Sequence, residues 1–141
     1  MNPTEKLVKK KFWTPYGVLA FLIILVFIIS IPGGAPGRAA FIAKASNYVS
    51  QIDTACQAYR TEYGTLPPTS ENYRLKKILC GDNPRGIPFI TLKPSDLSPN
   101  GDMIDPWKTP FRIVFDPESK VHVISAGPDK IFGTPDDITN D

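Results

Sequence analysis

The stretch that decides the fold of this chain lies near its C-terminus, where residues 125–137 read SAGPDKIFGTPDD. It directly follows a strand-like run, Val121 to Ser125, and contains three aspartates, two glycines and two prolines. Because proline fixes φ and glycine permits left-handed backbone conformations, the stretch is expected to fold back on itself as a shaped loop. Folding back would bring Asp129 close to Asp136 and Asp137.

Three carboxylates held together repel each other, and a bound cation relieves that repulsion. Ligands that are all oxygen atoms favour a hard ion, and Ca²⁺ tolerates irregular loop geometry better than Mg²⁺. We therefore interpret the loop as a calcium site. An EF-hand is excluded, because its third and fifth positions, counted from Asp129, are Ile131 and Gly133. The alternative is an ordinary exposed loop, since Asp, Gly and Pro are common in loops and acidic tails are often only solvated.

The length and charge of the chain limit its class. Its 141 residues suffice for one domain and a membrane anchor. Of the 16 Lys and Arg and 14 Asp and Glu, four lysines and one glutamate precede Arg38, so the remainder is about balanced. A balanced domain without a basic stripe is a poor nucleic-acid binder, so we expect no nucleic-acid partner.

A long uncharged segment, residues 12–31, directly follows three lysines at positions 9–11. As a helix it would be about 30 Å long, enough to cross the hydrocarbon core of a membrane. The positive-inside rule places the basic segment 1–11 in the cytoplasm and the domain 38–141 across the membrane. The rival interpretation is a cleaved signal peptide, because small residues follow the segment, but the apolar run is longer than the core of a usual signal peptide. Either way the domain is exported.

Export makes the two cysteines of interest. Cys56 and Cys80 are the only pair, and an exported domain meets conditions in which disulfides form. Each also lies among apolar residues, so two separate buried thiols are an equal alternative.

The domain begins with a predicted helix. Residues 32–37, PGGAPG, form a Pro/Gly break that ends the membrane helix. A second helix is predicted from Arg38 to Tyr63, and Gly64 is its stop signal. Apolar residues recur along it at three- and four-residue steps and predict one buried stripe that packs on a sheet. The stripe comprises Phe41, Ile42, Ala45, Tyr48, Val49, Ile52, Ala55, Cys56, Tyr59 and Tyr63.

The rest of the domain predicts a small antiparallel sheet. A short helix is expected over Asn72 to Cys80, followed by a long irregular stretch from Asp82 to Thr109. Within that stretch, Asp105-Pro106-Trp107 predicts a turn that the aspartate caps. Residues 111–115 and 121–125 alternate in polarity and predict a β-hairpin that leads into the acidic loop. The fold class is therefore α+β, with one long helix packed on a small antiparallel sheet.

Four segments of the chain form a recognisable series. They are residues 59–67 (YRTEYGTLP), 105–111 (DPWKTPF), 125–129 (SAGPD) and 133–138 (GTPDDI). In this series the chain resembles the G-type major pseudopilins of type II secretion systems, which are relatives of the type IV pilins. The likeness covers residues 39–138, and its most specific parts are the Asp-Pro-Trp turn and the Ser-x-Gly-x-Asp loop with its later Asp-Asp.

The resemblance implies a pilin-like fold in which the loop binds a structural calcium ion and folds the C-terminal region onto the sheet. Asp129, Asp136 and Asp137 would supply side-chain ligands, and the backbone carbonyls of Ala126 and Ile131 would complete the shell. It also implies a single-pass protein of the inner membrane whose domain lies in the periplasm or outside the cell. Its partners would be other pseudopilins, secretion-machine components or copies of itself.

The N-terminus departs from the family pattern. Pseudopilins are cut by a prepilin peptidase between Gly and Phe, and the fifth residue of the mature chain is Glu. Here Lys11 precedes Phe12, and the fifth residue counted from Phe12 is Tyr16. Two outcomes follow: a peptidase removes residues 1–11, or the segment remains as a plain anchor.

The sequence argues against an enzyme. The single histidine, His122, lies within a predicted strand, and no nucleophile–base pair is suggested by spacing. Adjacent residues such as Asp136 and Asp137 generally point apart, unlike a glycosidase carboxylate pair. We therefore expect no catalysis and no small-molecule substrate, but a structural subunit of a type II secretion or related pilus machine. The alternative is a membrane-anchored interaction domain with the same fold that does not polymerise.

Overall fold

The computed structural model describes residues 37–140. The predicted basic segment 1–11, the membrane helix 12–31 and all but the last residue of the Pro/Gly break lie outside the described residues. Within residues 37–140, no helix combines the length and the apolar character needed to cross a membrane.

The long helix α2 (Arg38–Tyr63) has the predicted bounds. Gly64 ends it in the left-handed conformation, with φ 78°, and donates its N–H to the Arg60 carbonyl at 2.7 Å. The predicted stripe is the buried face of the helix, except that Ile42 is exposed and Phe41, Tyr48 and Tyr63 are half-buried. Its buried residues are Ala45, Val49, Ile52, Ala55, Cys56 and Tyr59.

The sheet is antiparallel and has the strand order β1-β2-β3. Strands β1 (Arg112–Phe115) and β2 (Val121–Ser125) form the predicted hairpin, with Ile113 opposite Val123. Strand β1 begins one residue later than predicted, because Phe111 pairs its N–H with the Met103 carbonyl instead. The third strand, β3 (Ile138–Thr139), was not predicted, since two residues are too few to show a period.

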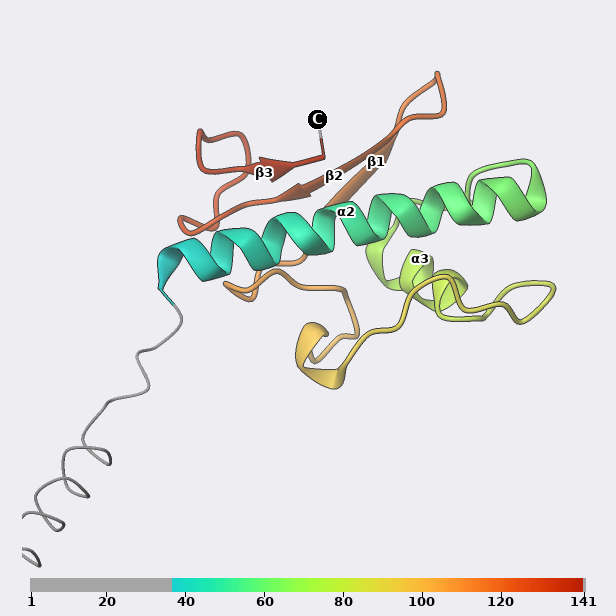
Figure 1. Ribbon diagram of the computed structural model, residues 1–141, viewed down its shortest axis with the longest axis horizontal. Helices are drawn as coiled ribbons and strands as arrows, with labels where there is room; N and C mark the ends of the chain where they lie inside the picture. The colour runs from blue at the N-terminus through green and yellow to red at the C-terminus, as the bar shows by residue number, and fades with distance from the viewer. Residues whose placement is uncertain (1–36, 141) are drawn as a thin grey trace, which may run out of the picture. The chain divides into compact units, whose positions relative to one another are not determined.

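The core lies between α2, the sheet and the short helix α3 (Asn72–Leu79) (Figure 1). Helix α3 ends one residue earlier than predicted, and its Leu75 and Leu79 are fully buried. The side-chain amide of Asn72 accepts the Met103 N–H at 2.7 Å and donates to the carbonyls of Met103 and Phe111. This amide therefore joins the start of α3 to the chain that enters the sheet.

The long connection after α3 is irregular, as predicted, apart from the 3₁₀ helix η1 (Pro94–Asp96). Apolar side chains hold it against the core: Ile90 is buried, and Phe89, Leu92 and Leu97 pack on the core as partly buried residues.

Both cysteines are free thiols. Cys56 is buried, and burial raises the pKa of its thiol to about 12. Cys80 is exposed, so neither of the two alternatives, a disulfide or two buried thiols, holds for this residue. The reason is its position one residue beyond α3, whose buried face ends with Leu79.

Strand β2 runs alongside part of α2 (Figure 1), and the segments before and after it contact the two ends of that helix. At the C-terminal end of α2, Arg60 donates from Nη1 to the Ser119 carbonyl in the hairpin turn at 3.3 Å. At the N-terminal end, Arg38 Nη2 lies 3.9 Å from Asp136 Oδ2. The hairpin therefore delivers the acidic loop beside the first turn of α2.

Candidate functional site

The Asp-Pro-Trp turn is shaped by one buried carboxylate. Asp105 is only 2% exposed, and its Oδ1 accepts the backbone N–H groups of Trp107 at 2.9 Å and Thr109 at 2.8 Å. The Asp105 N–H in turn donates to the Thr109 carbonyl at 2.9 Å. The prediction that aspartate caps this turn is confirmed.

The same carboxylate holds the start of the acidic loop. Its second oxygen, Oδ2, accepts the hydroxyl proton of the buried Ser125 at 2.7 Å. Ser125 Oγ then accepts the N–H of Gly127 at 3.2 Å. Asp105 and Ser125 are 20 residues apart, so this pair joins the turn before the hairpin to the loop after it.

The two arms of the loop meet at Gly127. This residue has φ +65°, and a Cβ placed on it would collide with the carbonyl oxygen of Asp136. Only glycine therefore allows the backbone of Asp136 to lie against the first residues of the loop. The predicted fold-back of the loop is confirmed at this contact.

The predicted ligands occupy different surroundings. Asp129 is exposed, and its Oδ1 accepts the N–H of Ile131 at 2.9 Å. The Ile131 side chain is 61% exposed, and its carbonyl accepts the Thr134 hydroxyl at 3.3 Å. Ala126, whose carbonyl is a predicted ligand, is fully buried.

The two carboxylate oxygens of Asp137 differ in their hydrogen bonding. Its Oδ2 accepts the Gly133 N–H at 2.7 Å, whereas its Oδ1 is buried and has no hydrogen-bond partner among residues 37–140. A buried carboxylate oxygen without a donor is costly, and a cation would satisfy it. No three Asp, Glu, His or Cys side chains in that part of the chain are grouped so as to hold a metal ion. The calcium site therefore stays a prediction, which the unsatisfied oxygen of Asp137 fits.

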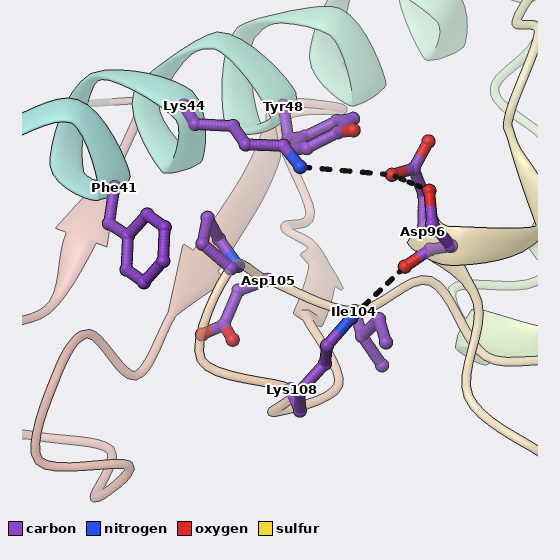
Figure 2. A pocket seen from close by; sticks show the side chains of 9 residues that line it. Phe41, Lys44, Tyr48, Asp96, Ile104, Asp105 and Lys108 are labelled. Atoms are coloured by element: carbon purple, nitrogen blue, oxygen red, sulfur yellow. Dashed lines mark hydrogen bonds and ion pairs between the residues drawn. The ribbon is translucent and has the colours of Figure 1, made fainter. Parts of the chain in front are cut away.

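A cleft of about 210 Å³ lies beside the Asp-Pro-Trp turn, at the N-terminal half of α2 (Figure 2). Figure 2 shows Lys44 and Tyr48 of α2 on one side and Asp96 of η1 on the other. Lys44 Nζ lies 4.0 Å from Asp96 Oδ1 and 5.4 Å from the centre of the Tyr48 ring. The lining residues are Phe41, Lys44, Tyr48, Ser95, Asp96, Ile104, Asp105, Pro106 and Lys108.

Two groups in the cleft have shifted pKa values. Burial raises the pKa of Tyr48 to about 12, and interaction with the Asp96 carboxylate contributes to this shift to a smaller extent. Burial alone would raise the pKa of Asp96, but interactions with the Tyr48 hydroxyl and the Lys93 N–H outweigh it. The Ser95 hydroxyl and the Lys44 ammonium act in the same direction, so the pKa of Asp96 is lowered. Asp96 is therefore a buried ionised carboxylate that stabilises the cleft walls.

No protein-family model matches the chain, and neither does any curated protein. Among solved structures, it is similar to the major pseudopilin of the type 2 secretion system of enterohaemorrhagic Escherichia coli, with a TM-score of 0.46 and 22% sequence identity. The match covers 72% of this chain and 87% of that one. A likeness at this level leaves the functional argument to the residues themselves.

Sequence reasoning missed the tertiary contacts of the site. Asp96 was not predicted to have a role, because a Pro-Ser-Asp run in an irregular stretch resembles any exposed turn. Asp105 and Ser125 were both identified, but as parts of separate motifs. Their spacing gave no signal that the side chains meet.

The close contact at Gly127 predicts that two glycine-to-alanine variants lose different amounts of stability. Both variants should lower the free energy of unfolding, because alanine is strained in the left-handed conformation. Gly127→Ala should lower it by about 2 kcal/mol or more in addition, because its Cβ also collides with the Asp136 carbonyl. Gly133 is a matched control, since its φ is +90° but a Cβ there meets nothing within 4 Å. Thermal unfolding followed by circular dichroism measures both losses, and equal losses would contradict the close contact.

The lowered pKa of Asp96 predicts an acid-dependent contribution to stability. Because the folded-state pKa lies below the unfolded value of about 4, the contribution is present above that pH and is lost as pH falls through the folded pKa. The stability difference between wild type and Asp96→Asn should therefore be largest near neutral pH and shrink in acid. Thermal unfolding measured from neutral to acid pH gives this stability difference. Asp82→Asn is the control, because the Asp82 side chain is 72% exposed. A difference that does not change with pH would refute the assignment.

Proposed function

We propose that this chain is a pseudopilin-like structural subunit of a type II secretion machine or a related pilus. The observation that supports this proposal most directly is the hydrogen bond from Ser125 Oγ to Asp105 Oδ2 at 2.7 Å. The most specific parts of the sequence resemblance are the Asp-Pro-Trp turn and the Ser-x-Gly-x-Asp loop, and this bond makes them one physical unit. Two distant motifs that perform one structural task support the resemblance more strongly than two separate matches would.

The long helix supports a role in assembly. Helix α2 buries one stripe against the sheet and α3, while polar residues such as Ser46, Ser50 and Gln51 are exposed. This exposed face is available to neighbouring subunits. In the proposal, residues 12–31 cross the inner membrane once, residues 1–11 are cytoplasmic, and the domain lies in the periplasm or outside the cell.

A structural calcium ion in the loop is part of the proposal. Its ligands would be the carboxylates of Asp129, Asp136 and Asp137 and the carbonyls of Ala126 and Ile131. The support is the buried Oδ1 of Asp137, which lacks a donor in the described chain. The ion would offset carboxylate repulsion and stabilise the folded loop by mass action.

The proposed role is structural and not enzymatic. The Nε2 atom of the single histidine, His122, lies 3.4 Å from Asp116 Oδ2, beside the turn of the hairpin.

A second candidate function is a membrane-anchored interaction domain that does not polymerise. The observation that favours it is the pair Lys11 and Tyr16, which stand where the family has Gly and Glu.

The intact mass of the protein extracted from its native membrane separates the two candidates. For a filament subunit, we expect the mass of a chain that begins at Phe12, with or without a methyl group. A full-length mass would instead favour the anchored interaction domain, because residues 1–11 would remain on the chain.

Calcium should raise the melting temperature of the full chain in detergent micelles. At a calcium concentration one hundred times the Kd, the expected stabilisation is about 2.7 kcal/mol. Asp136→Asn should show a smaller rise, since it removes one charged ligand, whereas the control Asp82→Asn should respond like wild type. A wild-type melting temperature that is independent of calcium would rule the ion out.

A further inference from the structure

We propose that the cleft beside the Asp-Pro-Trp turn receives the Glu118 side chain from the hairpin turn of a second copy of this chain. The ammonium groups of Lys44 and Lys108 would pair with the Glu118 carboxylate. The inference rests on the proposed function, since it names one interface through which a pseudopilin-like subunit would assemble.

The size and lining of the cleft favour a single side chain as its occupant. Its volume of about 210 Å³ lies below the roughly 300–1,000 Å³ that is usual for small-molecule sites. Part of its lining is apolar, namely Phe41, Ile104 and Pro106. Such a surface fits the aliphatic part of a long side chain, whose charged end would then meet the polar side of the cleft.

That polar side offers two ammonium groups. The Lys44 side chain is 52% exposed, and its Nζ lies 4.0 Å from Asp96 Oδ1, which is longer than a hydrogen bond. Lys108 is exposed, and its Nζ donates to the Ser95 carbonyl at 3.2 Å, which uses one of its three N–H groups. Figure 2 shows both side chains reaching toward η1 from different walls of the cleft. Both ammonium groups therefore retain donors for an incoming carboxylate.

The two carboxyl groups of the cleft do not depend on these lysines. Asp96 accepts the Lys93 N–H at 3.0 Å on Oδ2 and the Ser95 hydroxyl at 3.2 Å on Oδ1. Asp105 accepts its hydrogen bonds from the Asp-Pro-Trp turn and from Ser125, and both aspartates are buried. The exposed charges at the cleft are therefore the two positive ones.

The backbone of Lys108 also indicates a role for its side chain. This residue has φ 72°, a left-handed conformation that glycine adopts without strain and that costs a lysine free energy. Such strain is found most often at functional sites. Here it places an ammonium group at the cleft, where the turn alone requires no side chain.

The hairpin turn, residues 116–120, presents the complementary charge. The Glu118 side chain is 74% exposed and lies 3.0 Å from Lys120 Nζ, whose side chain is 66% exposed. An ion pair this exposed contributes little stability, so Glu118 can exchange Lys120 for another partner. The exposed Pro117 precedes it and offers an apolar ring to the apolar lining of the cleft.

The two surfaces lie at different ends of α2. The hairpin turn accepts a hydrogen bond from Arg60 in the last turn of the helix, whereas the cleft is lined by Lys44. These two residues are 16 positions apart, about 24 Å along a helix. One molecule therefore cannot bring the two surfaces together, but two copies can. A contact between different surfaces of identical copies produces a ring or an open filament.

Zero-length cross-linking tests the contact directly. A carbodiimide condenses a carboxylate and an amine that touch into an amide, with loss of water. In an equal mixture of unlabelled and isotope-labelled full-length protein in detergent micelles, we expect Glu118 of one isotope joined to Lys44 or Lys108 of the other. Glu71, with a 59% exposed side chain, is the control that should give no product with these two lysines. Associated protein without the Glu118 products would overturn the inference.

Charge reversal tests whether the pair contributes to association. Lys108→Glu should raise the Kd of self-association, measured by sedimentation velocity in detergent micelles, about tenfold or more, because like charges would then meet. Adding Glu118→Lys to this variant should restore association. Lys108→Gly should also raise the Kd without lowering the melting temperature, because glycine relieves the left-handed strain. Lys130→Gly is its matched control, since Lys130 is an exposed lysine of the acidic loop with φ 61°, and its Kd should equal that of wild type.

The outcomes separate this interface from the proposed function. A wild type that associates, with an unchanged Kd in Lys108→Glu, would overturn the inference and leave the pseudopilin-like role intact. A folded double variant that does not regain association would overturn it equally. A wild type that does not self-associate would overturn the polymerising role and the inference together. If Lys108→Glu does not fold, the Kd of Lys108→Gly decides in the same way.

Discussion

The double use of the Asp105 carboxylate is the constraint on which the site depends. A carboxyl group that is only 2% exposed is tolerated when its oxygens are hydrogen-bonded. Here one oxygen takes two backbone donors from the Asp-Pro-Trp turn, and the other takes the Ser125 hydroxyl. The turn and the loop therefore donate hydrogen bonds to the same buried side chain, and each constrains the position of the other.

Helix α2 provides the frame against which this unit is placed. The rings of Phe41 and Trp107 meet edge to face with centroids 6.0 Å apart, so the turn is packed against the first part of the helix. Strand β2 lies along the same helix and ends at Ser125, which delivers the loop to that point. Helix α2 thus contacts both the turn that follows Asp105 and the strand that ends at Ser125.

Local rules explain why much of the fold was predictable. The apolar stripe of α2 and the stop at Gly64 depend only on neighbouring residues, and both agree with the structure. The hairpin was predictable for the same reason. The exposure of Cys80 was not predictable, because apolar neighbours in sequence do not show which side of a helix end faces solvent. Strand β3 and the Tyr48–Asp96 interaction were missed because each is defined only by a partner elsewhere in the chain.

The sequence by itself determined the α+β class, the bounds of the long helix, the hairpin and the fold-back of the loop that follows it. These features follow from periodicity and from the φ preferences of glycine and proline, which act over a few residues. Only the tertiary structure decided that Asp105 bonds Ser125, that Asp136 packs against Gly127 and that Asp137 retains a buried oxygen without a donor among residues 37–140. Hydrogen bonds between distant side chains depend on how α2 and the sheet pack, and no local pattern encodes that distance.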